Sequence, residues 1–123
     1  MKDKILLVDD SKTSIENLSE LLNSEGMEVF EARNGLEGIK ILENNPDMKL
    51  VISDLHMPVM DGLTMCEEIR KIPKFSNLPI ILITSESSAD AKVRGKRSKI
   101  KAWIVKPCDP NKVLLIVKYL LQT

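Results

Sequence analysis

The sequence predicts an α/β domain in which five parallel strands alternate with five helices. Short apolar runs alternate with segments of helical periodicity from one end of the chain to the other. This alternation is typical of a parallel sheet covered by helices on both faces. The pattern is continuous, without a linker or an internal repeat, and 123 residues is the size of one domain. A single domain over residues 1–123 is therefore expected.

The first half of the chain supplies two strands and two helices. Residues 4–8 are expected to form the first strand, and the helix after it ends at Gly26. Residues 27–31 form a second, polar-flanked strand, which we place at an edge of the sheet. Asn34 and the glutamate three residues later resemble a capping box, opening a helix that ends before Pro46.

The middle of the chain continues the alternation. The third strand is expected over residues 49–53, and a loop then leads to Asp61, a suitable N-cap for a helix through Arg70. Pro79 begins the fourth strand.

The last part of the chain completes the (βα)5 pattern. Ser87 is the expected N-cap of a helix that runs to about residue 98, and residues 101–105 form the fifth strand. Asp109 and Pro110 then suit the N-cap and first position of the final helix.

Composition excludes several functional classes. No apolar run approaches the roughly 18 residues that would suggest a membrane span, and the N-terminus lacks a secretory apolar region, so a cytoplasmic protein is expected. Eighteen basic residues balance eighteen acidic ones and only 3% are aromatic, which disfavours direct nucleic-acid binding. Cys66 and Cys108 lack metal-binding spacing and are expected to be reduced thiols.

Four of the apolar runs end in polar residues of different kinds. Carboxylates follow the first and third strands, a hydroxyl follows the fourth and an ammonium follows the fifth; they are Asp9, Asp10, Asp54, Thr84 and Lys106. The carboxyl ends of parallel strands share one edge of a sheet, so these side chains should converge. Taken alone, Thr84 and Lys106 are more often structural than functional, Asp54 is only an acid at a strand end, and Asp9 with Asp10 could equally well start a helix. Their joint placement favours a functional site.

The clustered carboxylates suit a divalent cation. Carboxylates a few ångströms apart oppose folding by repulsion, and Mg²⁺ relieves it with one or two carboxylate ligands and several waters. We expect Asp10 and Asp54 to bind Mg²⁺ directly and Asp9 to act through water. Asp54 is also the candidate nucleophile for phosphoryl transfer, with Lys106 as a point charge and the Thr84 hydroxyl as a donor to a phosphoryl oxygen.

Four motifs resemble the receiver domains of two-component response regulators. They cover residues 5–10, 51–62, 83–85 and 103–107, within a match from Lys4 to about residue 121. The resemblance implies a flavodoxin-like doubly wound sheet in strand order 2-1-3-4-5, the order that the chemotaxis regulator CheY illustrates. The function it implies is signal transduction by an aspartyl phosphate.

The resemblance also assigns roles to site residues. Asp54 is similar to the phosphoryl acceptor, and Asp10, Asp54 and the backbone carbonyl of His56 resemble the Mg²⁺ ligands. Asp9 resembles the second acidic residue. His56 and Glu86 match positions that influence phosphoryl lifetime in the family.

The remaining roles concern the residues that respond to the phosphoryl group. Thr84 and Lys106 resemble the pair that senses the phosphoryl group, and Lys106 with Pro107 is similar to the family's cis peptide. Trp103 occupies the position of the switch aromatic, for which simple packing is the alternative. The resemblance implies that phosphorylation reshapes the surface of the fourth helix, fifth strand and fifth helix.

The chain stops just past the fifth helix, which resembles stand-alone receivers of the chemotaxis type without an output domain. Expected partners are a sensor histidine kinase or phosphotransfer protein, or a small phosphodonor, and a downstream protein target. The protein is not expected to be an enzyme, although it would assist its own phosphorylation and dephosphorylation. The alternative is an interaction module that works without phosphorylation, which would be expected to have lost Thr84, Lys106 or an acid of the cluster.

One position departs from the family pattern. Many receivers have glycine seven residues before the lysine of the Lys-Pro pair, where this chain has Lys99. Glycine adopts a left-handed cap without strain, so a differently shaped helix end is expected. Residues 92–101 are also strongly basic. A solvated charged face is the simpler explanation, and an acidic partner is the alternative.

Overall fold

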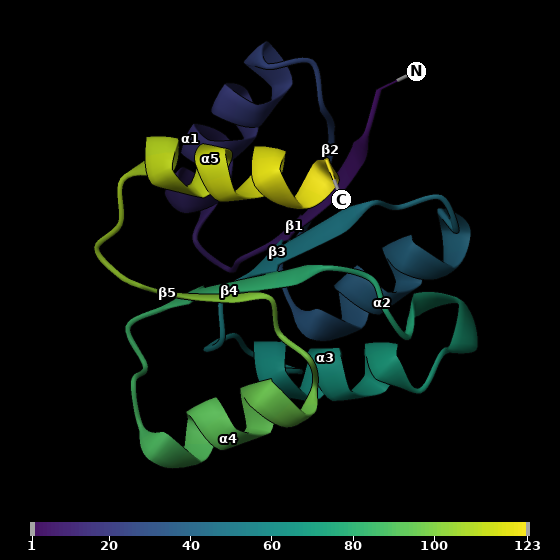
Figure 1. The fold of residues 1–123 in the computed structure, drawn as a ribbon, viewed down its shortest axis with the longest axis vertical. Coiled ribbons are helices and arrows are strands. Elements are labelled where there is room, and N and C mark those ends of the chain that lie inside the picture. Colours follow the sequence, from purple (N-terminus) through teal and green to yellow (C-terminus); the bar gives the residue numbers. More distant parts are fainter. Residues whose placement is uncertain (1, 123) are drawn as a thin grey trace.

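Five parallel strands form the sheet at the centre of the computed structural model, which describes residues 2–122 (Figure 1). The strands lie in the order β2-β1-β3-β4-β5, so the expected order is confirmed. Every neighbouring pair is parallel. The strands are β1 Lys4–Val8, β2 Glu28–Ala32, β3 Leu50–Ser53, β4 Ile80–Thr84 and β5 Ala102–Val105.

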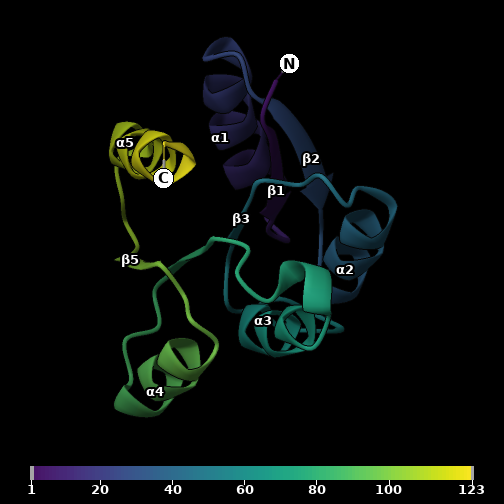
Figure 2. The ribbon, with the colours of Figure 1, turned by 45° about the vertical axis from the view of Figure 1, so that its right-hand side comes forward.

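Helices cover both faces of the sheet. One face carries α1 and α5, and the other carries α2, α3 and α4, as Figures 1 and 2 show from two directions. A short 3-10 helix lies between α3 and β4. The helices are α1 Lys12–Ser24, α2 Gly35–Asn44, α3 Gly62–Arg70, η1 Pro73–Phe75, α4 Ala89–Arg97 and α5 Pro110–Leu121.

The sheet separates two hydrophobic cores. Alternate side chains of the central strands point to opposite faces, so Leu6 and Leu82 pack under α2 to α4 while Leu7 and Ile81 pack under α1 and α5. The strands β3 and β4 are buried along their whole length. Burial on both faces explains why these strands read as unbroken apolar runs.

The edge strands are less buried. The strand β2 lies at one edge, as expected for a polar-flanked strand, but it begins at Glu28 rather than at Met27. The backbone N–H of Met27 donates to the Leu22 carbonyl in the turn that ends α1, and Ala32 pairs with Val8 of β1. The predicted bounds were therefore wrong by one residue.

Side chains cap the helices at their first turns. Asn34, Asp61 and Asp109 are the N-caps of α2, α3 and α5, so these three predictions are confirmed. The N-cap of α4 is Ser88 rather than Ser87, and the Ser88 hydroxyl accepts from the backbone of the third residue after it. The Glu86 carboxylate accepts from the Ser88 N–H at 3.1 Å, and this bond holds Ser88 outside the helix.

The helices α1 and α4 end in the same left-handed turn. Gly26 has φ 87° after α1, and Lys99 has φ 59° after α4. In each turn the residue with positive φ and the residue after it donate N–H groups back to the helix carbonyls, a Schellman motif. The expected difference in shape at Lys99 was wrong, because a lysine adopts the conformation that glycine favours.

Arg70 of α3 fixes the end of α4. Its guanidinium donates to the carbonyls of Ser98 at 2.7 Å and Lys99 at 3.3 Å. The same group donates to the carbonyls of Phe75 at 2.9 Å and Leu78 at 2.7 Å. Burial lowers the pKa of Arg70, and these four carbonyls compensate the cation. One side chain thus joins α3, the segment before β4 and the end of α4.

The described part of the chain, residues 2–122, contains no helix long and apolar enough to cross a membrane. Both cysteines are free thiols, as predicted. Burial raises the pKa of the Cys66 thiol to about 12.

Replacing Lys99 with Gly should stabilise the protein. The left-handed conformation costs an L-residue about 1 to 2 kcal/mol, and the extra freedom of glycine in the unfolded chain offsets part of the gain. We expect an increase of up to about 1 kcal/mol in the free energy of unfolding, or a few degrees in Tm, measured by thermal denaturation.

Gly26→Lys is the matched control for this prediction. A Cβ at Gly26 would meet no atom within 4 Å, so its backbone conformation alone would oppose the substitution. The variant should lose stability by about 1 kcal/mol. A Lys99→Gly protein no more stable than the parent would contradict the assignment of strain to this turn.

Candidate functional site

The polar residues that follow the strands meet at the carboxyl edge of the sheet. Parallel register aligns Val8 with Ser53, so the acids after β1 and β3 become neighbours. Backbone bonds extend this alignment past the strand ends, from the Asp54 N–H to the Val8 carbonyl and from the Lys106 N–H to the Thr84 carbonyl. Strand pairing therefore brings the predicted residues together.

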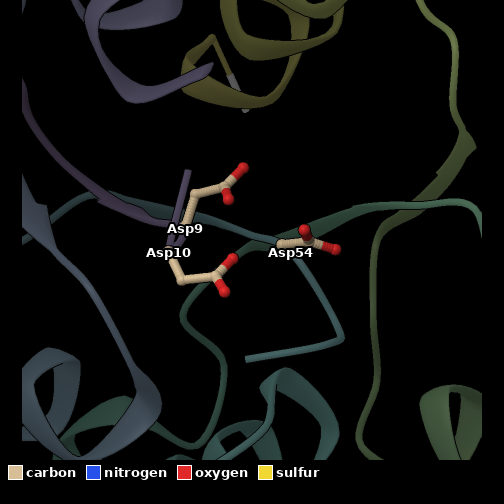
Figure 3. Close-up of side chains that lie close together, drawn as sticks. All are labelled: Asp9, Asp10 and Asp54. Carbon is tan, nitrogen blue, oxygen red and sulfur yellow. The ribbon is translucent and has the colours of Figure 1, made fainter. Parts of the chain in front are cut away.

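Three carboxylates form a tight group at this edge. Ligand atoms of Asp9, Asp10 and Asp54 all lie within 4.8 Å of one another, and Figure 3 shows the three side chains gathered where β1 and β3 end. Asp9 is only 7% exposed, whereas Asp10 is exposed. The cost of burying charge therefore falls on Asp9 and Asp54, whose side chains are both largely buried, rather than on Asp10.

Both oxygens of the Asp9 carboxylate have partners. Oδ1 accepts from the Ser11 N–H at 2.9 Å, and Oδ2 lies 3.7 Å from Nζ of Lys106. Burial raises the pKa of Asp9 and the charges of Asp54 and Asp10 raise it further, against the opposing effects of Ser11 and Lys106. Asp9 is thus a carboxylate held in an unfavourable environment.

Asp54 and Lys106 form the shortest ion pair of the cluster. Oδ2 of Asp54 lies 3.0 Å from Nζ of Lys106, and Oδ1 accepts from the Leu55 N–H at 2.6 Å. Burial alone would lower the pKa of Lys106, but the hydrogen bond to Asp54 and the charges of Asp54 and Asp9 outweigh it and raise the pKa. The peptide bond from Lys106 to Pro107 is cis, as the resemblance implied.

The donor set fits a hard divalent cation. Three carboxylates face one ammonium group, which leaves two formal negative charges uncompensated at a half-buried edge. Oxygen-only ligands of this kind are those that Mg²⁺ prefers.

Glu86 links the site to Trp103. The buried Thr84 hydroxyl accepts from the Glu86 N–H at 3.1 Å, and the Glu86 carbonyl accepts from the Trp103 indole at 3.0 Å. The Glu86 carboxylate lies 3.0 Å from Nε2 of His56, across the two loops that follow β3 and β4. Hydrogen bonds from Ser88 and His56 lower the pKa of Glu86. One residue therefore contacts the threonine, the aromatic side chain and the exposed histidine.

Two glycines create close approaches that sequence reasoning missed. A Cβ at Gly95 of α4 would lie 2.9 Å from the Trp103 ring, so this glycine makes room for the indole. A Cβ at Gly62 would collide with the Asp54 carbonyl. Glycine inside a helix costs about 1 kcal/mol relative to alanine. Its presence at position 95 of the predicted helix was therefore a sign in the sequence that another group packs closely there.

A cavity of about 470 Å³ opens beside the cluster. Its lining includes Asp9, Asp54 and Lys106, together with residues of the sheet, of α1 and of α5 that are partly polar and partly aliphatic. The volume falls within the range of small-molecule sites. It lies on the α1 and α5 face of the sheet.

A parallel sheet in this strand order, with acids after β1 and β3 and a lysine after β5, matches the arrangement expected of a receiver domain. The comparison with known families agrees: residues 5–118 match the response regulator receiver domain, and the chain belongs to this family.

Individual relatives come from chemotaxis systems. The chain is 36% identical over 109 residues to chemotaxis protein CheY1 of Helicobacter pylori, covering 88% of each. It is 39% identical over 117 residues to the sensor histidine kinase CheAY of the same species, covering 93% of this chain but only 14% of that protein. The structure of CheY4 of Vibrio cholerae is similar with a TM-score of 0.89 and 31% identity, covering 98% of this chain and 99% of that one. The chain is thus a receiver of the chemotaxis type.

Replacing Asp9 with Asn should raise stability in the presence of a chelator. The amide oxygen can keep the bond from Ser11 while the buried charge is removed, so we expect a gain of about 1 kcal/mol in the free energy of unfolding. Asp10→Asn should gain less because Asp10 is exposed. If the cluster binds Mg²⁺, added Mg²⁺ should stabilise both variants less than the parent. Thermal unfolding with and without Mg²⁺ measures these effects.

The pH dependence of the Asp9 variant provides a control. A raised pKa means that the folded protein binds a proton more readily than the unfolded chain, so the cost of Asp9 is present at neutral pH. This cost disappears as the pH falls through the raised pKa of Asp9 toward the ordinary carboxyl pKa, because the buried carboxylate is then protonated. The stability difference between variant and parent should shrink accordingly, and a constant difference would argue against a charge effect.

Proposed function

We propose that this chain is a response regulator switched by transfer of a phosphoryl group to Asp54. The observation that carries the proposal is the pairing of Asp54 with Lys106 at 3.0 Å within a group of three carboxylates. A carboxylate in such a group is an oxygen nucleophile, and the lysine is placed to stabilise negative charge on a phosphoryl group. Membership of the receiver family supports this assignment.

The transfer reaction exchanges one bond to phosphorus for another. An oxygen of Asp54 attacks the phosphorus of a phosphohistidine on a histidine kinase or phosphotransfer protein, and the phosphorus–nitrogen bond breaks. The imidazole departs with the electron pair. With acetyl phosphate as donor, a phosphorus–oxygen bond breaks and acetate departs. Water later attacks the aspartyl phosphate, releasing inorganic phosphate and restoring the carboxylate. The protein would assist both its phosphorylation and its dephosphorylation.

Mg²⁺ is part of the proposal. Asp10, Asp54 and the backbone carbonyl of His56 would hold the ion, and Asp9 would act through water. When bound, the ion would supply positive charge to balance the phosphoryl oxygens.

Thr84 and Trp103 would transmit the change. The Thr84 hydroxyl now accepts from the Glu86 N–H, and its own proton can be donated to a phosphoryl oxygen. Movement of Thr84 toward that oxygen would alter its bond with Glu86, whose carbonyl holds Trp103. Lys106 would contact another phosphoryl oxygen while remaining near Asp54.

The output would be protein binding at α4, β5 and α5. These elements expose several apolar side chains, namely Val93, Val105, Leu115 and Tyr119. A downstream target that contacts this surface would sense the position of Trp103. A cytoplasmic location is part of the same proposal.

Incubation with acetyl phosphate and Mg²⁺ should add one phosphoryl group to the protein, detected by intact-mass spectrometry. The adduct should be absent from Asp54→Asn, which keeps a side chain of similar shape but lacks the nucleophilic carboxylate. A chelator should also abolish it.

Short reaction times and candidate kinases distinguish rapid hydrolysis from failure to react. An adduct that persists in Asp54→Asn would identify a different acceptor. Absence of an adduct under every condition would favour the alternative, a receiver-fold interaction module that works without phosphorylation.

Phosphorylation should change the fluorescence of Trp103. It is the only tryptophan in the chain, and its indole donates to the Glu86 carbonyl next to Thr84. Adding phosphodonor to the Mg²⁺-bound protein should shift the intensity or wavelength of emission, recorded at steady state.

Thr84→Ala is the matched variant for this measurement. It should still accept the phosphoryl group on Asp54, as mass spectrometry would verify, but its fluorescence should respond much less. An undiminished response in phosphorylated Thr84→Ala would show that the signal reaches Trp103 by another route.

A further inference from the structure

The end of α4 and the loop after it carry a dense set of cations. Residues 92–101 contain six of the eighteen Lys and Arg residues and no acidic residue. The rest of the chain therefore holds twelve basic residues against eighteen acidic ones, a formal charge of −6. A protein that is neutral overall is thus strongly polarised.

Four of these cations form what we call the cationic end of α4: Lys96, Arg97, Lys99 and Lys101. All four are exposed. Within residues 2–122, none has a carboxylate partner within 4.0 Å. Arg94 differs, because it pairs with Glu67 of α3 at 2.9 Å. The charges of the cationic end therefore face solvent without compensation.

Helix stability does not account for the whole set. Cations in the last turn interact favourably with the helix dipole, which gives a structural reason for Lys96 and Arg97. Lys101 lies beyond the helix, and Lys99 has a left-handed backbone that glycine would adopt without strain. A strained residue with an exposed charged side chain points to a role outside the fold.

The cations are held on a rigid support. The Schellman turn fixes Lys99 against the carbonyl of Lys96, and Arg70 donates to the Lys99 carbonyl. The Lys101 N–H donates to the Ile80 carbonyl where β4 begins. Charges on an ordered backbone lose less conformational entropy on binding than charges on a mobile loop.

The cationic end lies away from the acidic cluster. Lys101 precedes β5 and bonds to the first residue of β4, whereas the cluster lies where the strands end. Figures 1 and 2 show α4 on the outer side of the fold, on the face opposite α1 and α5. A partner bound there would leave Asp54 accessible.

We infer that the cationic end of α4 binds a carboxylate-rich segment of a partner protein. Charge complementarity defines the partner chemistry, and a short acidic segment matches four charges on one helix end and its loop. Long polyanions fit less well, because the formal charge of −6 on the rest of the chain would repel nucleic acid or an anionic membrane. Binding should be weak and sensitive to salt, since exposed ion pairs contribute little individually.

The test uses the unphosphorylated full chain and a short fluorescein-labelled peptide rich in glutamate, followed by fluorescence anisotropy. A peptide with glutamine in place of glutamate is the probe control. We expect the glutamate peptide to bind at low salt and to bind several-fold more weakly at about 0.15 M salt. Because Asp54 chemistry is not involved, failure here would leave the proposed phosphorylation untouched.

Two charge-matched variants locate the site. Neutralising the cationic end to glutamine should weaken peptide binding about tenfold or more. Neutralising four exposed lysines elsewhere should change it little; these are Lys2, Lys12, Lys40 and Lys112. Equal losses in both variants would overturn the proposal, because they would show a response to net charge alone.

Two further measurements complete the test. Lys99→Gly should gain thermal stability yet bind the glutamate peptide several-fold more weakly, and unchanged binding would remove Lys99 from the site. Tighter binding to an oligothymidine of similar length, or to phosphatidylserine vesicles, would overturn the assignment to an acidic protein segment.

Discussion

Repulsion among three carboxylates at the end of β1 and β3 is the constraint on which the structure depends. Oxygens of Asp9, Asp10 and Asp54 lie within 4.8 Å, and Lys106 compensates only part of their charge. The strands beneath them are buried, apart from Lys4 at the start of β1, and are paired on both sides, so they hold the acids together against this repulsion. Stability from two hydrophobic cores is thus used to maintain a site that would bind a cation and a phosphoryl group.

Much of this arrangement was predictable because it follows from local patterns. Unbroken apolar runs identified the buried strands, and capping residues such as Asn34 and Asp61 marked helix starts within a residue. The placement of Asp54 and Lys106 at one edge followed from parallel topology, since all strands of a parallel sheet end at the same edge.

The errors and omissions arose where particular side-chain contacts override local preference. Ser88 caps α4 because the Glu86 carboxylate holds its N–H, and nothing in local spacing separates it from Ser87. Lys99 keeps a left-handed turn that Arg70 supports from another helix. The bond from Arg70 to Lys99 joins residues distant in sequence, and the bond from Ser88 to Glu86 is a local side-chain contact; propensity and periodicity detect neither.

Glu86 uses its main chain and its side chain in different directions. The backbone N–H and carbonyl contact Thr84 and Trp103, while the carboxylate reaches His56 and Ser88. Every amino acid except proline offers the same backbone groups at this position. The hydrogen bonds from residue 86 to Thr84 and Trp103 therefore do not depend on which side chain residue 86 carries. The side-chain contacts with His56 and Ser88 can differ between homologous proteins while these backbone hydrogen bonds are kept.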